Sequence, residues 1–265
     1  MTLHKFNKRA TTMLPIKSKA PAVDGAVQIL QLLARSTVSL SLSEIVEETG
    51  LANSTTHRLL DSLLTHNMVS IDPSQQKKYC MGASIFQLAS TVFSRQDSIS
   101  IFHPIAEILK NETYHSVYLN IEIGSRIVVI AKAESSMAKV SNVYIGTTFP
   151  SYEVAAGIAI LSTRNEKYQL QYLEKTLPKG RNHTEQVLKQ LEALKQAQRL
   201  GYALSKSRYN NELNFIAAPV LDMNNKALAA ISLGIEDLEF TPHNIRIVAA
   251  HLIQATRQLS SRLRL

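Results

Sequence analysis

Polar side chains between residues 53 and 62 have the composition of a surface that contacts DNA. Arginine can donate two hydrogen bonds to O6 and N7 of guanine, and Ser, Thr and Asn side chains bond phosphates or base edges. The residues that offer such groups are Asn53, Ser54, Thr55, His57, Arg58 and Ser62. A second polar and basic group follows at Gln75, Gln76, Lys77 and Lys78. We expect both groups to contact double-stranded DNA, the second by crossing the phosphate backbone.

Helical spacing separates these polar residues from the side chains that need burial. At 100° per residue, one side of a helix collects Thr56, Leu59, Leu60, Leu63 and Leu64. The opposite side carries Ser54, Thr55, Arg58 and Ser62, with His57 at the border. Asn53 or Ser54 is the predicted N-cap. Because an ordinary solvated helix has the same two sides, spacing alone leaves both interpretations open.

The surrounding pattern predicts the elements that hold this helix. The segment 24–34 has a broad apolar face and is predicted to be helical. Ser43 is the predicted N-cap of a second helix, which ends at Gly50. Short strand-like runs at 68–71 and 78–81 are separated by a polar turn and predict a hairpin. Three helices followed by a hairpin are typical of a winged helix-turn-helix.

The second half predicts an α+β domain in which helices flank an antiparallel sheet. The predicted strands are 116–123, 127–133, 140–145, 202–204, 215–221 and 227–233. The predicted helices are 101–113, 154–162, 166–174, 184–200 and 242–262. A further amphipathic helix at 85–98 is expected to link the two halves and to contribute to dimerisation through Phe86, Leu88, Val92 and Phe93.

The net charge of +8 is not concentrated in the predicted DNA-binding domain. Residues 1–19 carry five basic residues and no acid, whereas residues 20–99 carry five basic residues and seven acids. The basic leader, residues 1–21, is interpreted as a disordered, solvated segment or as an arm along a nucleic-acid backbone. Pro15 and Pro21 are expected to interrupt any helix there, and a start at Met13 would remove three of its charges.

Several classes of site lack the residues that they need. The single cysteine, Cys80, excludes an internal disulfide, and no two histidines stand at helical i, i+3 or i, i+4 spacing for a metal. No phosphate loop, dinucleotide fingerprint or nucleophile elbow is present. We expect no catalytic residues, metal or cofactor. The longest apolar run, Val154–Leu161, is too short to span a membrane, and the leader lacks the apolar core of a secretory signal, so we expect a cytoplasmic protein.

The region from Val23 to about Leu88 resembles the winged helix-turn-helix domain of the IclR family of bacterial transcriptional regulators. The motifs that carry the resemblance occur in family order and are Leu42-Ser43-Glu44-Ile45, Thr49-Gly50-Leu51, Ser54-Thr55, His57-Arg58-Leu59-Leu60 and Lys78-Tyr79…Gly82. The resemblance implies a DNA-binding domain at 22–84 with its helix-turn-helix at about 44–63, a linker helix at 85–98, and an effector-binding domain of GAF or profilin-like fold at 99–265. It also implies a homodimer or a dimer of dimers on an operator, and a repressor more readily than an activator of a metabolic operon.

The resemblance is looser in the second half, where family members bind small acids. The resemblance implies that the effector-binding residues are those at the positions of the family's motifs, namely Ala155, Ala156, Gly157, Ser205, Phe215, Ser232 and Gly234. Ser205 stands where an acid is common, Phe215 replaces a frequent Cys, and Gly234 replaces a Ser. The resemblance therefore implies a narrower pocket for a less hydroxylated carboxylic acid, or a Phe215 that belongs to the core. The competing interpretation of the whole chain is a small-molecule-binding or enzymatic protein whose helix-turn-helix makes only protein contacts.

Overall fold

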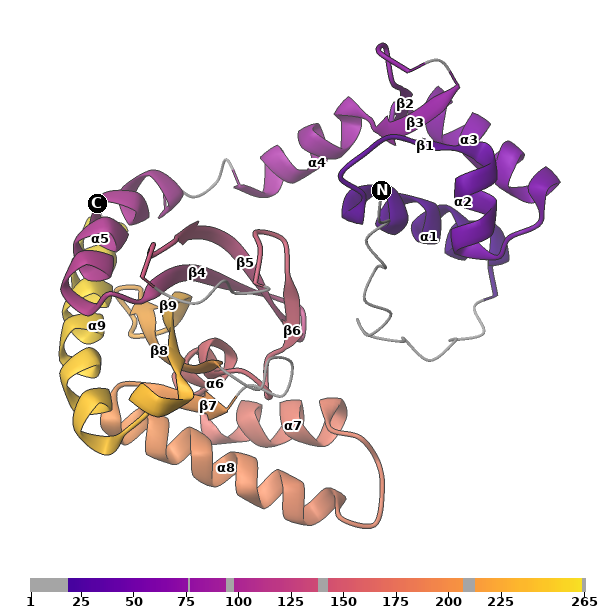
Figure 1. Cartoon of the computed structure of the whole chain (residues 1–265). Coiled ribbons are helices and arrows are strands. Elements are labelled where there is room, and N and C mark those ends of the chain that lie inside the picture. Colours follow the sequence, from indigo (N-terminus) through magenta and orange to yellow (C-terminus); the bar gives the residue numbers. More distant parts are fainter. Residues whose placement is uncertain (1–18, 76, 94–97, 138–142, 207–212, 264–265) are drawn as a thin grey trace. The chain divides into compact units, whose positions relative to one another are not determined.

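The computed structural model describes residues 19–75, 77–93, 98–137, 143–206 and 213–263. The chain divides into two compact units, Met1–Arg95 and Gln96–Leu265 (Figure 1). Both units mix helices with antiparallel sheet, which confirms the predicted α+β class. The leader falls outside the described residues up to residue 18. The prediction that Pro21 would interrupt a helix is wrong, because Pro21 occupies the first turn of α1 (Pro21–Arg35).

The first unit is a winged helix-turn-helix, as predicted. Its helices are α1 (Pro21–Arg35), α2 (Leu42–Thr49) and α3 (Asn53–Thr65). Its strands are β1 (Leu40–Ser41), β2 (Val69–Ile71) and β3 (Lys78–Met81), which form an antiparallel sheet in the order β1-β3-β2. The side chains at the centre of its core are Ile29, Leu33, Ile45, Leu60, Leu63 and Val69. The two-residue strand β1 was not predicted, because its pairing with β3 is a tertiary contact.

The N-cap of α2 lies two residues before the predicted one. The Ser41 hydroxyl accepts a hydrogen bond from the Glu44 backbone N–H, and the Glu44 carboxylate accepts one from the Ser41 N–H at 2.7 Å. This capping box satisfies two donors that the first helical turn leaves open, so Ser43 is not the N-cap. At the other end Gly50 takes a left-handed conformation (φ 69°) that turns the chain toward α3, as predicted.

The segment between the two units begins with α4 (Ala83–Phe93). The predicted linker helix spanned 85–98, and its described part lies in α4 up to Phe93. Residues 94–97 lie outside the described part of the chain, and Ser98 is the first residue of α5 (Ser98–Thr113).

The second unit contains a six-stranded antiparallel sheet in the order β6-β5-β4-β9-β8-β7. The strands are β4 (Ser116–Ile123), β5 (Arg126–Ala133), β6 (Thr148–Pro150), β7 (Ala203–Lys206), β8 (Leu213–Leu221) and β9 (Ala227–Glu236). Five of them lie where the sequence predicted them. The predicted strand at 140–145 is wrong in its described part, because residues 143–145 are not in a strand and Thr148–Pro150 pairs with β5 instead.

Helices cover both sides of this sheet, and α5 packs beside α9 (Pro242–Leu263) on one of them (Figure 1). The other side is covered by α6 (Ala155–Leu161), α7 (Glu166–Thr176) and α8 (His183–Leu200), with α6 directly on β7, β8 and β9. A short 3-10 helix, Asp237–Glu239, precedes α9. None of the helices among the described residues is long and apolar enough to cross a membrane.

The capping box gives a test of where α2 begins. Ser41→Ala removes the hydroxyl that accepts the Glu44 N–H and is expected to cost about 1 kcal/mol, so amides of α2 should exchange with solvent about fivefold faster. The measurement is native-state hydrogen exchange of residues 45–49. Ser43→Ala, an exposed position in the same turn, should leave these rates unchanged. A larger effect of Ser43→Ala than of Ser41→Ala would contradict the assignment.

Candidate DNA-binding and effector-binding faces

The inner side of α3 anchors the helix. Thr56, Leu60 and Leu63 are buried, and the Thr56 hydroxyl is satisfied by the Ala52 carbonyl at 3.1 Å. The predicted N-cap is wrong, because Ala52 occupies that position and makes no side-chain cap bond. Asn53 and Ser54 therefore belong to the first turn of the helix, where their side chains do not bond the helix's own amides. This leaves both side chains available to an external partner.

The outer side of α3 is exposed, as the helical spacing predicted. The exposed residues are Asn53, Ser54, Thr55, His57, Arg58, Asp61 and Ser62. The His57 Nδ1 lies 3.0 Å from a carboxylate oxygen of Asp61, one turn further along the helix. No hydrogen bond or ion pair of Arg58 occurs with any residue that the structure describes. Sequence reasoning missed Asp61, although its i, i+4 spacing from His57 was a usable signal.

The four wing residues do not form one uniform basic tip. Gln75 and Lys77 are exposed, and Lys77 adopts a left-handed conformation (φ 67°) in the turn. Lys78 is partly buried, with its Nζ 4.0 Å from the Glu44 carboxylate. Gln76 lies outside the described residues. The wing thus presents Gln75 and Lys77 outward, whereas Lys78 also contacts the first turn of α2.

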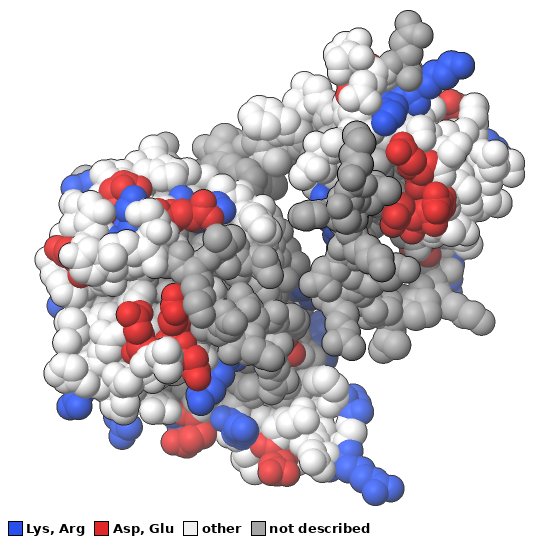
Figure 2. Space-filling view, viewed as in Figure 1, with Lys and Arg blue, Asp and Glu red and all other residues white. Residues whose placement is uncertain are grey.

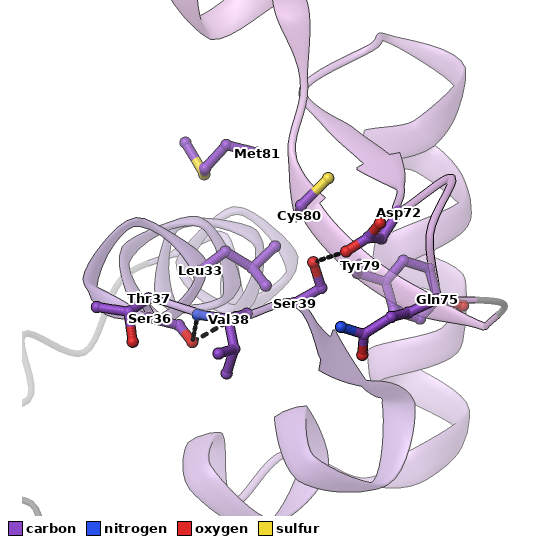
Figure 3. Close-up of a pocket in the computed structure, with 10 residues that line it drawn as sticks. All are labelled: Leu33, Ser36, Thr37, Val38, Ser39, Asp72, Gln75, Tyr79, Cys80 and Met81. Carbon is purple, nitrogen blue, oxygen red and sulfur yellow. Dashed lines mark hydrogen bonds between the residues drawn. The ribbon is translucent and has the colours of Figure 1, made fainter.

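The base of the wing is held by a carboxylate (Figure 3). Asp72 accepts hydrogen bonds from the hydroxyls of Ser39 and Ser74 and from the Ser74 N–H. These bonds, first that of Ser39, lower the pKa of Asp72 from 3.8 to about 2, so this side chain is ionised at neutral pH. Ser39 precedes β1 and Asp72 follows β2, so the contact ties the segment before α2 to the wing turn.

The seven residues that the family resemblance implies for the effector site lie together in the second unit, on the side of the sheet that α6 covers. Ser205, Phe215 and Gly234 are successive cross-strand neighbours on β7, β8 and β9. Ser232 is two residues from Gly234 and therefore faces the same side. The sheet thus brings four of the residues together from three strands.

The remaining three residues form the start of α6. The Ala155 backbone N–H donates to the Ser205 hydroxyl at 2.9 Å, which joins the helix to β7. Gly157 packs against the backbone of Ser151, where a Cβ atom would lie only 2.0 Å from the Ser151 carbonyl oxygen. Any side chain at position 157 would therefore push α6 away from the segment before it.

Phe215 and Gly234 occupy complementary space. The Phe215 ring lies over Gly234, where a Cβ atom would make ordinary contact at 3.4 Å. The same ring meets Tyr118 edge to face, with 6.1 Å between centroids. Phe215 also packs against the core cluster beneath α6. It can therefore be both a core residue and a wall of the proposed pocket.

A buried amide on β4 was missed by sequence reasoning. Asn120 donates to the Ser232 hydroxyl at 2.9 Å and to the carbonyls of Tyr118 and Ala230. Its side chain is almost fully buried on the same side of the sheet as Ser232. A lone Asn within a strand-like run gives no sign of which face it will occupy, so only the pairing of β4 with β9 identifies it.

Metal-binding clusters of three or more His, Cys, Asp or Glu side chains are absent from the described part of the chain. Cys80 is partly buried, and its thiol lies 3.5 Å from the Ser70 carbonyl oxygen. On the face of the second unit seen in Figure 2, acidic and basic side chains are interspersed. The excess positive charge therefore forms no large single-sign patch on that face.

Comparisons with known proteins agree with this geometry. The IclR helix-turn-helix family model matches residues 22–73, and the model of the C-terminal domain of the bacterial transcriptional regulator IclR matches residues 90–261. The acetate operon repressor of Salmonella typhimurium is 23% identical over 257 residues, which cover 96% of this chain and 93% of the repressor. The crystal structure of the Thermotoga maritima IclR covers 92% of this chain and 99% of its own at 23% identity, with a TM-score of 0.71.

A structure with a bound ligand is also similar. An IclR homologue from Microbacterium hydrocarbonoxydans, complexed with 4-hydroxybenzoate, has a TM-score of 0.71 at 17% identity and covers 91% of this chain and 98% of its own. The fold and the two family models define a DNA-binding transcriptional regulator. The chain belongs to the IclR family. Its relatives are regulators and not enzymes, which agrees with the expected lack of catalytic residues.

Proposed function

We propose that this regulator binds its operator through the first turns of α3, with the wing contacting the adjacent backbone. The supporting observation is the polar, exposed outer side of a helix whose opposite side is fully anchored in the core. The N-terminal turns carry Asn53, Ser54, Thr55 and Arg58, whereas Asp61 lies further along the helix. Because Asp61 would repel phosphates, the helix should enter the major groove with its N-terminal part closest to the bases.

Arg58 is the residue with the greatest capacity to discriminate between base pairs. Arg58→Ala should lose about 1–3 kcal/mol of discrimination between the operator and a shuffled duplex, because a bidentate contact to guanine is lost. Fluorescence anisotropy at one fixed salt concentration measures both affinities. Arg35→Ala, at the exposed end of α1, is the matched control and should leave the ratio unchanged. An unchanged ratio in Arg58→Ala would contradict the proposed face and favour the interpretation in which the helix-turn-helix makes only protein contacts.

The proposed assembly is a homodimer or a dimer of dimers. In a symmetric dimer two α3 helices would meet successive major grooves, with half-sites about 34–36 Å apart. Exposed apolar side chains on α4 support its proposed role in dimerisation, since Phe86 is 77% and Leu88 is 56% exposed. The side chains of Val92 and Phe93, the other two residues of the predicted contact, lie outside the described set.

We further propose that a small carboxylic acid binds in the second unit, between the start of α6 and the faces of β7, β8 and β9. The acid would control how the protein regulates a metabolic operon, with the protein acting as a repressor more readily than as an activator. Its polar groups are partly engaged, since the hydroxyl of Ser205 accepts the Ala155 N–H and that of Ser232 accepts from Asn120. With Phe215 over Gly234, few polar groups remain for hydroxyls of a ligand. This supports an acid with few hydroxyl groups, which would shift the population of dimer geometries that fit the operator.

The proposed pocket is tested by filling it. Ala156→Phe should abolish the increase in melting temperature that the best ligand from a panel of two- to eight-carbon carboxylic acids, 4-hydroxybenzoate included, gives with the wild type. The melting temperature without ligand controls for folding, and Ser232→Ala, which removes one hydroxyl without adding volume, serves as a second variant. A ligand-induced shift that persists at full size in both variants would place the effector elsewhere.

A further inference from the structure

A second cleft lies at another position in the second unit. A cleft of about 810 Å³ opens between the β4–β5 turn and α7, which is within the range of small-molecule sites. The residues that line it are Gly124, Ser125, Arg126, Pro150, Tyr152, Tyr168, Gln171, Tyr172, Lys175 and Thr176. None of the residues assigned to the effector pocket belongs to it. Along β4 the turn is about 20 Å from Tyr118, at the opposite end of the strand.

The floor of the cleft is held in place by hydrogen bonds. The Ser125 carbonyl accepts one from the Tyr172 hydroxyl at 2.9 Å and another from the Ser151 N–H at 3.1 Å. The turn is thereby fixed both to α7 and to the segment before α6. Arg126 is oriented in the same way, because its Nε and Nη2 donate to the hydroxyl or carbonyl of Thr148 at 3.1–3.3 Å. A cleft with a fixed floor loses little entropy when it binds a ligand.

The α7 wall is a single helix face at i, i+3, i+4 and i+7 spacing, formed by Tyr168, Gln171, Tyr172 and Lys175. The rings of Tyr168 and Tyr172 stack, with 6.3 Å between centroids and 21° between planes. Tyr168 is 41% exposed, so its ring is accessible to a ligand. The exposed Tyr168 ring, backed by the buried Tyr172 ring and beside the Gln171 amide, offers an apolar surface to a flat group and one polar contact at its edge.

The charge of the cleft is positive. Arg126 and Lys175 line it and no acid does, and neither cation has an ion-pair partner among the described residues. Two acids close in sequence to lining residues have cationic partners, since Glu122 lies 3.6 Å from Arg164 and Glu174 lies 2.9 Å from His183. An anion in the cleft would therefore meet two cations and no carboxylate among the lining residues.

We infer that this cleft binds a flat organic anion, an aromatic carboxylate in chemical class, at a site separate from the proposed effector pocket. The carboxylate would contact Arg126 and Lys175, and the ring would lie against Tyr168. A ligand there would touch the turn that bonds Ser151, the residue whose backbone supports Gly157 at the start of α6. The cleft is thus connected to the effector pocket through the chain between them.

The test titrates the full-length protein with 2-naphthoate in an isothermal calorimeter. The expected result is saturable binding of one molecule per chain in the wild type. Lys175→Gln and Gln171→Glu should weaken it by about fivefold or more, because the first removes a charge that contacts the carboxylate and the second adds a repelling one. Lys167→Gln, an exposed lysine on α7 that does not line the cleft, is the matched control and should bind like the wild type.

Ala156→Phe distinguishes this site from the effector pocket. Unchanged 2-naphthoate binding in this variant excludes a site at the start of α6, and weakening in Lys175→Gln and Gln171→Glu then places the ligand in the cleft, whether or not the proposed effector pocket is correct. Three results overturn the inference: no saturable binding, wild-type affinity in both Lys175→Gln and Gln171→Glu, or loss of binding in Ala156→Phe. All substituted cleft positions are exposed, so melting temperatures near that of the wild type should confirm that these variants fold.

Discussion

Burial of one side of α3 determines how the DNA-binding unit can work. Leu60 and Leu63 pack among α1, α2 and β2, and Thr56 can join them because its hydroxyl is bonded to Ala52. With this side fixed, the helix cannot rotate without exposing leucines, at a cost of roughly 1.5–3 kcal/mol for each side chain. Arg58 and the polar residues of the first turn are therefore held outward, as the proposed DNA-reading surface requires.

The second unit depends on a similar constraint, close packing against backbone. Gly157 lets α6 lie directly on Ser151, and the Phe215 ring lies over Gly234. These contacts bring the start of α6 to β7, where Ser205 bonds the Ala155 N–H. The departures at positions 215 and 234 are thus one packing arrangement, in which an aromatic ring covers a glycine on the neighbouring strand. The acid proposed for this pocket would meet a surface with few free hydroxyl groups.

Much of this architecture could be predicted from the sequence, because periodicity reports burial. The outer side of α3 and five strands of the second sheet follow from it. Details that depend on partners distant in sequence could not be predicted. The cap of α2 is at Ser41 because Glu44, which is also near Lys78 of the wing, reaches back to it. The position of Asn120 beside Ser232 depends on the pairing of β4 with β9, and the cleft beside α7 depends on the contact between Tyr172 and Ser125. Neither pairing can be predicted from local sequence.

Net charge alone gave a weak indication of DNA binding, since residues 20–99 are slightly acidic. We attribute sequence discrimination instead to a few side chains on α3. Sequencing of genomic fragments that the purified protein retains, for the wild type and for a variant with Ser54, Thr55 and Arg58 changed to Ala, tests this most directly. We expect one shared, near-palindromic motif among the fragments that the wild type retains, and loss of this motif in the variant. Recovery of the same motif by both proteins, or of no motif by the wild type, would contradict it.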